Sequence, residues 1–235
     1  MTARTTGVPA AGPRLRPYDR AVEGSEGYTA AEEVANSLTH GLGLLLALTG
    51  LVVLVVAAAA RGGARETIAC GVFGASLVLL YASSTLYHSL HSARVKAVLR
   101  ALDHSAIFLL IAGTYTPFTL VTLRGPWGWS LFAVVWTLAV VGITLRLVLR
   151  RRPTALFLGL YLAMGWCVIV AARPLFAAIG PSGVALLAAG GLAYTVGVPF
   201  YVWRRLPYHH AVWHAFVLAG SAFHYAAVLR YVALT

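Results

Sequence analysis

Residues 36–60 read NSLTHGLGLLLALTGLVVLVVAAAA, a run with no Asp, Glu, Lys or Arg. A helix needs about 20 mainly apolar residues to cross the hydrocarbon core of a bilayer. The whole chain has a similar character, since 60% of its 235 residues are hydrophobic and 11% are charged. Soluble domains are about 45–50% apolar and about 25% charged. The sequence therefore predicts an all-α integral membrane protein.

Further apolar stretches follow this one, and basic residues, glycine or proline separate them. With residues 36–60 they make seven expected transmembrane helices, the others being 67–88, 102–122, 129–149, 154–171, 183–203 and 210–231. The polar residues 1–31 have no apolar core of the kind found in signal peptides. We expect residues 1–31 to form a flexible cytosolic tail and residues 32–235 to form a seven-helix transmembrane domain.

The basic residues predict the orientation of the chain. Thirteen of the 18 Lys and Arg fall in the tail and around the loops after the second, fourth and sixth spans, and five fall on the other side. The positive-inside rule then places the N-terminus in the cytosol and the C-terminus outside, in a plasma or inner membrane. The formal net charge of +11 would suggest nucleic acid in a soluble protein. Here the basic residues lie between apolar runs, so we expect membrane lipids and no nucleic acid as partners.

Four polar residues meet at the cytosolic face in this topology. His88 ends the second span, Asp103 begins the third, and His210 and His214 begin the seventh. Asp103 is the only acidic residue after Glu66. A carboxylate within a bilayer costs about 2.5–3.5 kcal/mol on insertion scales, so it usually persists for a functional reason.

These residue types suit a zinc site. His210 and His214 are four positions apart and share one helix face, as in HExxH zinc helices, although the Glu is missing here. With His88 they would leave the fourth position open, which is typical of catalytic Zn²⁺. Asp103 would hydrogen-bond a water on the metal, bind the metal directly or orient an imidazole. Ser84, one turn before His88, could hydrogen-bond the same water.

Simpler explanations exist for each residue. An HxxxH pair can arise by chance among eight histidines, and a single His88 at a helix end is commonly interfacial. Asp103 could pair with Arg100 or cap the third helix. The shared depth of the four residues favours zinc. We expect His224, about 15 Å deeper, to be a hydrogen-bonded core residue. The remaining histidines near the site are His40, His91, His104 and His209.

Short motifs at and around these positions resemble one known family. They are EEVANSLTHG at 32–41, STLYH at 84–88, LDHS at 102–105, GTYTPF at 113–118, YHHAVWH at 208–214 and FVLAGS at 216–221. Together they resemble the bacterial hemolysin III proteins, which belong to the progestin and adipoQ receptor family and are related more distantly to alkaline ceramidases. The resemblance covers about residues 30–235.

The resemblance implies a seven-helix fold with the N-terminus inside. It implies zinc ligands at His88, His210 and His214, with Asp103 near the zinc water and Ser84 beside it. It also implies a lipid-facing cavity and, from eukaryotic relatives, ceramide hydrolysis. The motif that spans Glu33, Asn36 and His40 matches the family as well, without an assigned role.

The expected function is that of a zinc-dependent, hydrolase-like protein acting on membrane lipids with a ceramide-like amide, in membrane lipid homeostasis. Zinc would lower the pKa of its water towards 7 and polarise the amide carbonyl. Asp103 would act as general base and Ser84 would help to hold the oxyanion. The alternatives are a non-catalytic membrane-state sensor or receptor with structural zinc, a cytolysin as the family name implies, and a proton or ion carrier that uses Asp103 and histidines.

Overall fold

The computed structural model describes residues 27–149 and 152–235, so most of the expected tail lies outside the described residues. The described chain is all helical, as predicted. Its long helices are α2 (Ala30–Arg61), α3 (Ala64–Ser89), α4 (Ala93–Pro117), α5 (Gly125–Val148), α6 (Thr154–Trp166), α7 (Ala172–Val202) and α8 (His209–Val228). Short π or 3-10 segments follow three of them: η1 (Phe118–Thr122), η2 (Cys167–Ala171) and η3 (Leu229–Ala233).

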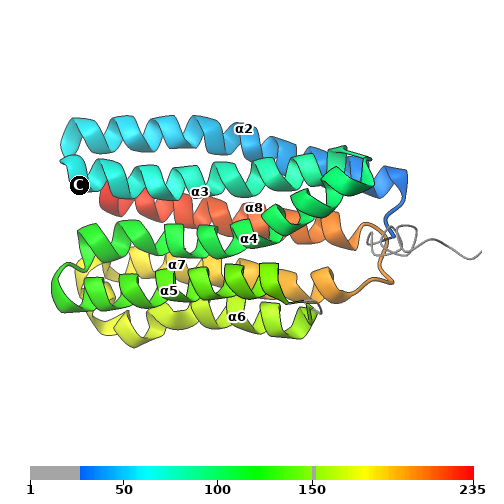
Figure 1. Ribbon diagram of the computed structural model, residues 1–235. Helices are drawn as coiled ribbons and strands as arrows, with labels where there is room; N and C mark the ends of the chain where they lie inside the picture. The colour runs from blue at the N-terminus through cyan, green and yellow to red at the C-terminus, as the bar shows by residue number, and fades with distance from the viewer. Residues whose placement is uncertain (1–26, 150–151) are drawn as a thin grey trace, which may run out of the picture.

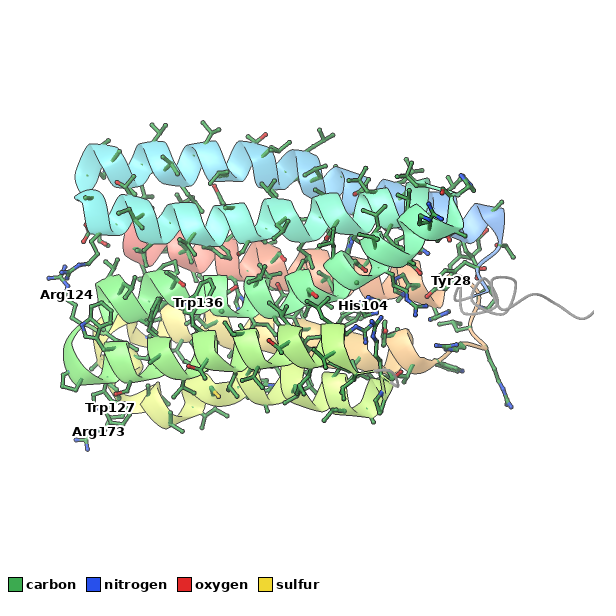
Figure 2. All side chains as sticks on the ribbon, in the orientation of Figure 1. Tyr28, His104, Arg124, Trp127, Trp136 and Arg173 are labelled. Carbon is green, nitrogen blue, oxygen red and sulfur yellow. The ribbon has the colours of Figure 1, made fainter. Side chains whose placement is uncertain are left out.

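The helices run side by side in an elongated bundle (Figure 1). α2 packs on both α3 and α8, so the first and last helices of the described chain are neighbours. α4 joins this group through α3, while α5, α6 and α7 form the other half of the bundle. Tyr28, just before α2, and the C-terminus lie at opposite ends of the bundle (Figures 1 and 2).

The surface of α2 shows the pattern expected of a helix in lipid. Its buried positions include small residues such as Gly43 and Ala47, whereas Leu45 and Leu46 are 65% and 60% exposed. A Cβ atom on Gly43 would lie 2.6 Å from a ring carbon of Tyr81, so α2 and α3 approach as closely as they do because this residue has no side chain. Small residues at helix contacts and large apolar residues on the outside are typical of membrane bundles.

Within the described ranges, six helical stretches are long and apolar enough to cross a membrane, one fewer than the sequence suggested. The difference lies in Thr154–Val202, a single stretch of 49 residues that contains α6 and α7. Its backbone is non-helical at Gly180, where φ is 64° and ψ is −177°, a conformation that glycine adopts readily. The Trp166 indole Nε1 donates a hydrogen bond to Thr195 Oγ1 over 3.1 Å, so the chain folds back within this stretch.

The start of α4 differs from the expectation. The basic segment 91–100 was expected to be a loop, but α4 begins at Ala93 with Ser92 as N-cap. Lys96 lies on this helix, and its charge is compensated by an ion pair with Glu33 of α2. Asp103 therefore lies almost three turns inside α4, so the alternative in which Asp103 caps the third helix is wrong.

Candidate metal centre

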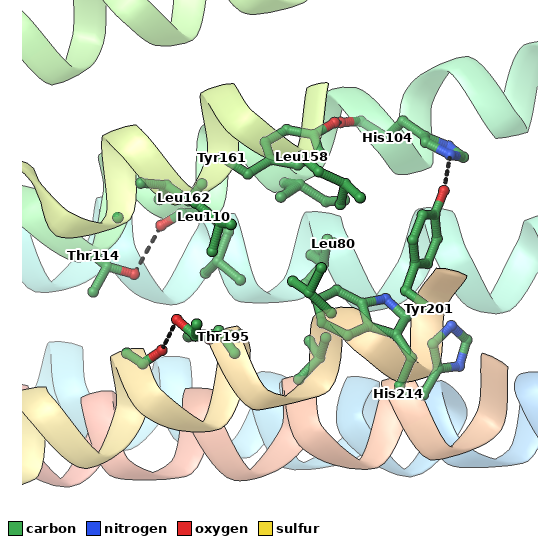
Figure 3. Close-up of a pocket in the computed structure, with 18 of the residues that line it drawn as sticks. Leu80, His104, Leu110, Thr114, Leu158, Tyr161, Leu162, Thr195, Tyr201 and His214 are labelled. Atoms are coloured by element: carbon green, nitrogen blue, oxygen red, sulfur yellow. Dashed lines mark hydrogen bonds between the residues drawn. The ribbon is translucent and has the colours of Figure 1, made fainter. Parts of the chain in front are cut away.

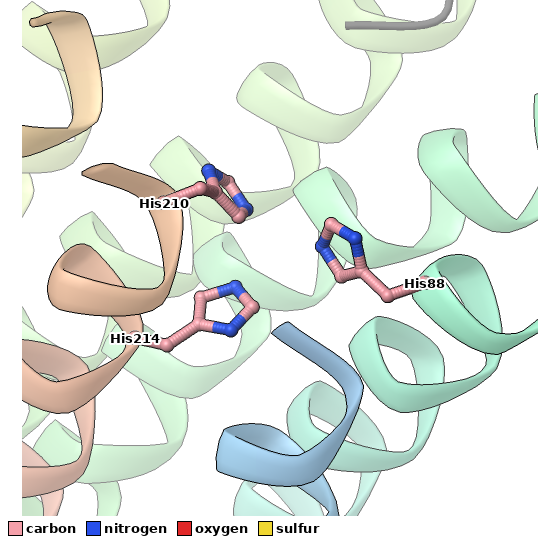
Figure 4. A group of neighbouring side chains, drawn as sticks. All are labelled: His88, His210 and His214. Carbon is pink, nitrogen blue, oxygen red and sulfur yellow. The ribbon is translucent and has the colours of Figure 1, made fainter. Parts of the chain in front are cut away.

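Three histidines meet where the end of α3 approaches the start of α8 (Figure 4). The ring centroids of His210 and His214 lie 4.5 Å apart, and the His88 ring lies 5.0 Å from His210 and 5.2 Å from His214. One nitrogen from each ring lies within 4.8 Å of the others, and all three residues are buried. Small ring rotations would bring such nitrogens to the spacing of ligands around one zinc ion. The structure thus brings together three residues in a group that could hold a metal ion.

The start of α8 aims two of its three histidines at this point. Tyr208 precedes the helix in a left-handed conformation, with φ 57° and ψ 19°. His210 and His214 follow on one helix face because their spacing is close to one turn. His209, about 100° further around the helix, points to α7 instead, where its Nδ1 lies 3.0 Å from the backbone oxygen of Phe200. His209 therefore lies outside the group that could hold a metal ion.

Contacts with α2 fix the orientation of the His88 ring. Its Nδ1 lies 2.6 Å from Glu33 Oε2 and 3.4 Å from Asn36 Nδ2. The shorter contact decides the tautomer, since an Nδ1–H group donates to the carboxylate. The other nitrogen, Nε2, is buried and has no hydrogen-bond partner within the described chain. A ring nitrogen held by a carboxylate while the other stays available is the usual arrangement for a metal-binding histidine.

The His214 ring is held in a similar way from α2. Its Nδ1 lies 3.2 Å from both the Asn36 backbone oxygen and Thr39 Oγ1. The ring of His40 stacks on it with centroids 3.4 Å apart and planes at 11°. His210 Nδ1 is buried and has no hydrogen-bond partner among the residues that the structure describes. Oriented rings and unsatisfied buried nitrogens both fit a metal ion, because a buried polar atom without a partner is otherwise costly.

Tyr28 covers the histidine group at the end of the bundle (Figure 2). Its ring centroid lies 5.1 Å from that of His210, 5.7 Å from His209 and 5.9 Å from His88. Glu32 holds the adjoining chain in place, since its side chain accepts hydrogen bonds from the backbone N–H groups of Thr29 and Tyr208. The hydrogen bond between Glu32 and Tyr208 therefore holds the start of α2 against the start of α8, next to the histidine group.

A pocket opens beside the histidines (Figure 3). Ser84, Asp103, His210 and His214 line one part of it, and the rest of the lining is largely apolar. Ser84 is fully buried, and its Oγ has no hydrogen-bond partner in residues 27–149 and 152–235. The Asp103 carboxylate lies 3.8 Å from His104 Nδ1, and the Asp103 side chain is 12% exposed. The structure thus places both predicted catalytic residues on the wall of one cavity with two of the predicted ligands.

A second pocket adjoins this one and shares lining residues with it, among them Thr114, Trp166 and His224. His224 lies outside the group that could hold a metal ion, and its Nε2 lies 3.1 Å from the backbone oxygen of Leu187, so the expectation of a hydrogen-bonded residue deeper in the bundle is confirmed. The two pockets are therefore adjoining spaces, and the first of them begins at the histidine group.

The other two histidines take separate positions. His91 is exposed in the connection between α3 and α4. His104 is buried, with its Nδ1 2.8 Å from the Arg100 backbone oxygen and its Nε2 3.4 Å from the hydroxyl of Tyr201. Neither belongs to the group that could hold a metal.

The polar residues of α2 that support the site had no role assigned in the sequence analysis. Glu33, Asn36 and His40 are spaced by three and four positions, so they share one face of α2, and that face meets His88 and His214. A polar stripe on an otherwise apolar helix was the available signal. Tyr28 had no such signal, since it lies before the first apolar stretch.

The fold and the site define a multi-pass α-helical membrane protein with a buried three-histidine group that could hold a metal ion. The family model described as "Haemolysin-III related" matches residues 28–225. The chain is 49% identical over 201 residues to Hemolysin-3 of Bacillus cereus, with 86% of this chain and 92% of that protein covered. It is 47% identical over 204 residues to the Hemolysin-3 homolog of Bacillus subtilis (strain 168), with 87% and 96% covered.

A more distant relative is the monocyte to macrophage differentiation factor of Homo sapiens, 27% identical over 210 residues, with 87% of this chain and 86% of that protein covered. The chain therefore belongs to the haemolysin III family, within the progestin and adipoQ receptor family.

Proposed function

We propose that the protein is a zinc-dependent, hydrolase-like protein of the cell membrane that acts on an amide-linked, ceramide-like lipid and serves membrane lipid homeostasis. The observation that carries the proposal is the buried group of His88, His210 and His214, with unsatisfied ring nitrogens at His88 and His210. It adjoins a largely apolar pocket that also exposes Ser84 and Asp103. Metal ligands, a carboxylate and a hydroxyl around one apolar pocket suit cleavage of a polar bond within a lipid.

Zinc is the metal that this group suits best. Three neutral imidazoles are preferred ligands of Zn²⁺, and a fourth open position is typical of catalytic zinc. When bound there, zinc would supply a Lewis acid for the carbonyl oxygen and a water of lowered pKa.

The side chains of the pocket have distinct tasks in this proposal. Asp103 accepts the proton of the attacking water as general base. Ser84 donates a hydrogen bond to the carbonyl oxygen as negative charge develops on it, and its buried Oγ has no partner among the described residues to compete for that bond. The adjoining apolar pockets hold the hydrocarbon chain and exclude water from the site.

The proposed topology has seven spans with the N-terminus in the cytosol. At 1.5 Å per residue, the 49 residues of Thr154–Val202 would extend over roughly 70 Å, more than twice the core thickness of about 30 Å. The non-helical backbone at Gly180 and the bond from Trp166 to Thr195 support two passes within this stretch. The opposite positions of Tyr28 and the C-terminus support an odd number of crossings.

A non-catalytic sensor or receptor is the second candidate. The ligands come from α3 and α8, and α2 contacts both, so a metal could act by joining these helices. Structural zinc normally has four protein ligands, whereas the group in the described chain has three. A cytolysin is a further alternative because two relatives carry the name Hemolysin-3.

Asp103→Asn tests the hydrolase directly. The substitution keeps the size of the side chain but removes its ability to accept a proton. We expect the purified variant to retain zinc, with hydrolysis of a ceramide-like amide reduced about 10²–10⁴-fold. Glu66→Gln, at the far end of α3, serves as the control and should hydrolyse at the wild-type rate. Full activity in zinc-loaded Asp103→Asn would refute the hydrolase mechanism and favour the sensor.

A further inference from the structure

His40 is a buried histidine of α2 that lies outside the group that could hold a metal ion. It is only 3% exposed, and in the part of the chain that the structure describes neither of its ring nitrogens has a hydrogen-bond partner. Two aromatic rings hold it in place, since it stacks on His214 and meets Tyr81 edge to face, with the His40 and Tyr81 centroids 5.0 Å apart. A neutral imidazole has one donor and one acceptor nitrogen, and burial of both without partners is costly. The ring is therefore suited to bind a polar group of a ligand.

His40 lies at the level of Ser84 on the neighbouring helix. The contact between Asn36 and His88 fixes the register of α2 and α3, which run in opposite directions (Figure 1). His40 follows Asn36 by four positions, which is about one helical turn. Ser84 precedes His88 by the same interval, so it reaches the same level from α3. Both residues line the pocket, and Ser84 Oγ, like the His40 nitrogens, has no hydrogen-bond partner among the residues described.

The stacking on His214 places His40 beside the proposed metal centre without making it a ligand. The two ring centroids are 3.4 Å apart, and the ring planes are inclined by only 11°. The lone pair of an imidazole nitrogen lies in the plane of its ring, so two stacked rings direct their nitrogens along parallel planes and not towards one ion. A ligand group that binds His40 therefore lies only a few bonds from a group held at the metal centre.

The ligand group that suits His40 best is a hydroxyl. A hydroxyl can both donate and accept, so it can bind whichever ring nitrogen of His40 it reaches. A hydrocarbon would leave the nitrogens without a partner, and a buried ionised group would need an opposite charge beside it. The two rings packed on His40 supply no such charge, since Tyr81 is a phenol and the His214 imidazole is neutral as a metal ligand.

We propose that His40 determines which lipids the pocket accepts, by forming a hydrogen bond with a hydroxyl that lies next to the amide of the lipid. The inference rests on the proposed function, since it takes the group at the metal centre to be a lipid amide. When Ser84 holds the amide carbonyl, a hydroxyl close to the amide reaches His40 at the same level, and the hydrocarbon lies in the apolar part of the pocket. A lipid without that hydroxyl leaves the His40 nitrogens buried and unpaired, so it binds more weakly.

The test measures lipid binding to purified, zinc-containing full-length protein. The probes are dihydroceramide with a palmitoyl chain, which has two hydroxyls near its amide, and the two analogues that each lack one of them. All proteins carry Asp103→Asn, so that the probes are not hydrolysed. In this background His40→Phe keeps an aromatic ring on His214 but removes both nitrogens. Thr114→Val is the matched control, because Thr114 lines the pocket away from His214 (Figure 3) and its Oγ1 already donates to the Leu110 backbone oxygen over 2.8 Å.

The Asp103→Asn protein and its Thr114→Val control should bind dihydroceramide about 10-fold more tightly than at least one of the analogues. With His40→Phe the three lipids should bind about equally, at unchanged zinc content. Should His40→Phe lose zinc or fail to fold, His40→Leu also removes the nitrogens and provides the comparison.

A preference that persists in zinc-loaded His40→Phe would show that His40 only supports His214, and it would overturn the inference. Equal binding of the three lipids before His40 is changed would overturn it as well. Hydrolysis by the wild-type protein is assayed separately. Absence of turnover together with a preference that depends on His40 would refute only the proposed hydrolase activity.

Discussion

Glu33 and His88 are 55 positions apart in sequence, yet the Glu33 carboxylate accepts a hydrogen bond from the His88 imidazole over 2.6 Å. The same carboxylate forms an ion pair with Lys96, so one side chain of α2 links α3 to α4. This contact leaves Nε2 of His88 as the nitrogen available to a metal. Within the described chain, the first helix therefore adds no residue to the group that could hold a metal ion, but it sets the orientation of one member of that group.

Glu33→Gln should weaken metal binding. Glutamine can still accept a hydrogen bond, but it lacks the negative charge that makes the imidazole a better ligand. Loss of such a partner typically costs 10–100-fold in metal affinity. The dissociation constant of purified protein, measured by competition with a chelator of known affinity, should rise by that factor. Glu66→Gln should leave it unchanged, and an unchanged value in Glu33→Gln would remove Glu33 from the site.

Single substitutions of the three histidines should remove most of the metal. We expect His88→Ala, His210→Ala and His214→Ala each to lose stoichiometric zinc in elemental analysis of purified protein, because two remaining imidazoles hold the ion weakly. His224→Ala is the matched control, since its ring is hydrogen-bonded to Leu187 in the same pocket but stands outside the group. Wild-type protein without any transition metal would contradict the metal centre.

Tyr28→Ala should accelerate exchange of the metal without removing it. The Tyr28 ring lies against His88, His209 and His210, so its loss opens the site to water and chelators at that end of the bundle. We expect a chelator to extract zinc about 10-fold faster from Tyr28→Ala than from wild type. Both proteins should have the same zinc content at the start. Tyr28→Phe keeps the ring and should behave as wild type. Equal extraction rates in all three proteins would show that Tyr28 gives no protection.

Reporter fusions would test the topology. A fusion at residue 235 should report the exterior, and a fusion within residues 150–153 should report the cytosol. A fusion at Gly180 should again report the exterior if Thr154–Val202 crosses twice. A cytosolic C-terminus would require an even number of spans and would contradict the proposed orientation.

The sequence predicted the all-helical class and the grouping of the three histidines because both depend on where the long apolar runs begin and end. Long apolar runs set the spans, and the ends of those spans fix which residues share a depth. His88, His210 and His214 could be found in this way, since each lies at the end of a run and the family motifs carry the same residues.

Other features depend on helix rotation and on local compensation of charge, which hydropathy does not reveal. The contacts of His88 with Glu33 and of His214 with Asn36 join residues more than 50 positions apart, and only the rotation of α2 decides them. The basic segment before Asp103 was expected to be a loop because of its charge. It is instead the first part of α4, where Lys96 forms an ion pair with Glu33. Arg146 resembled a loop residue for the same reason and lies on a buried face.

The separation of His88 from His210 and His214 along the chain also sets an order of events during synthesis. His88 emerges with α3, whereas His210 and His214 emerge only with α8, the last long helix. The 126 positions between His88 and His214 correspond to about 6–25 s of translation at roughly 5–20 residues per second. The nascent chain therefore holds only one of the three histidines for most of that interval, and the group that could hold a metal ion is complete only after the start of α8 has been made.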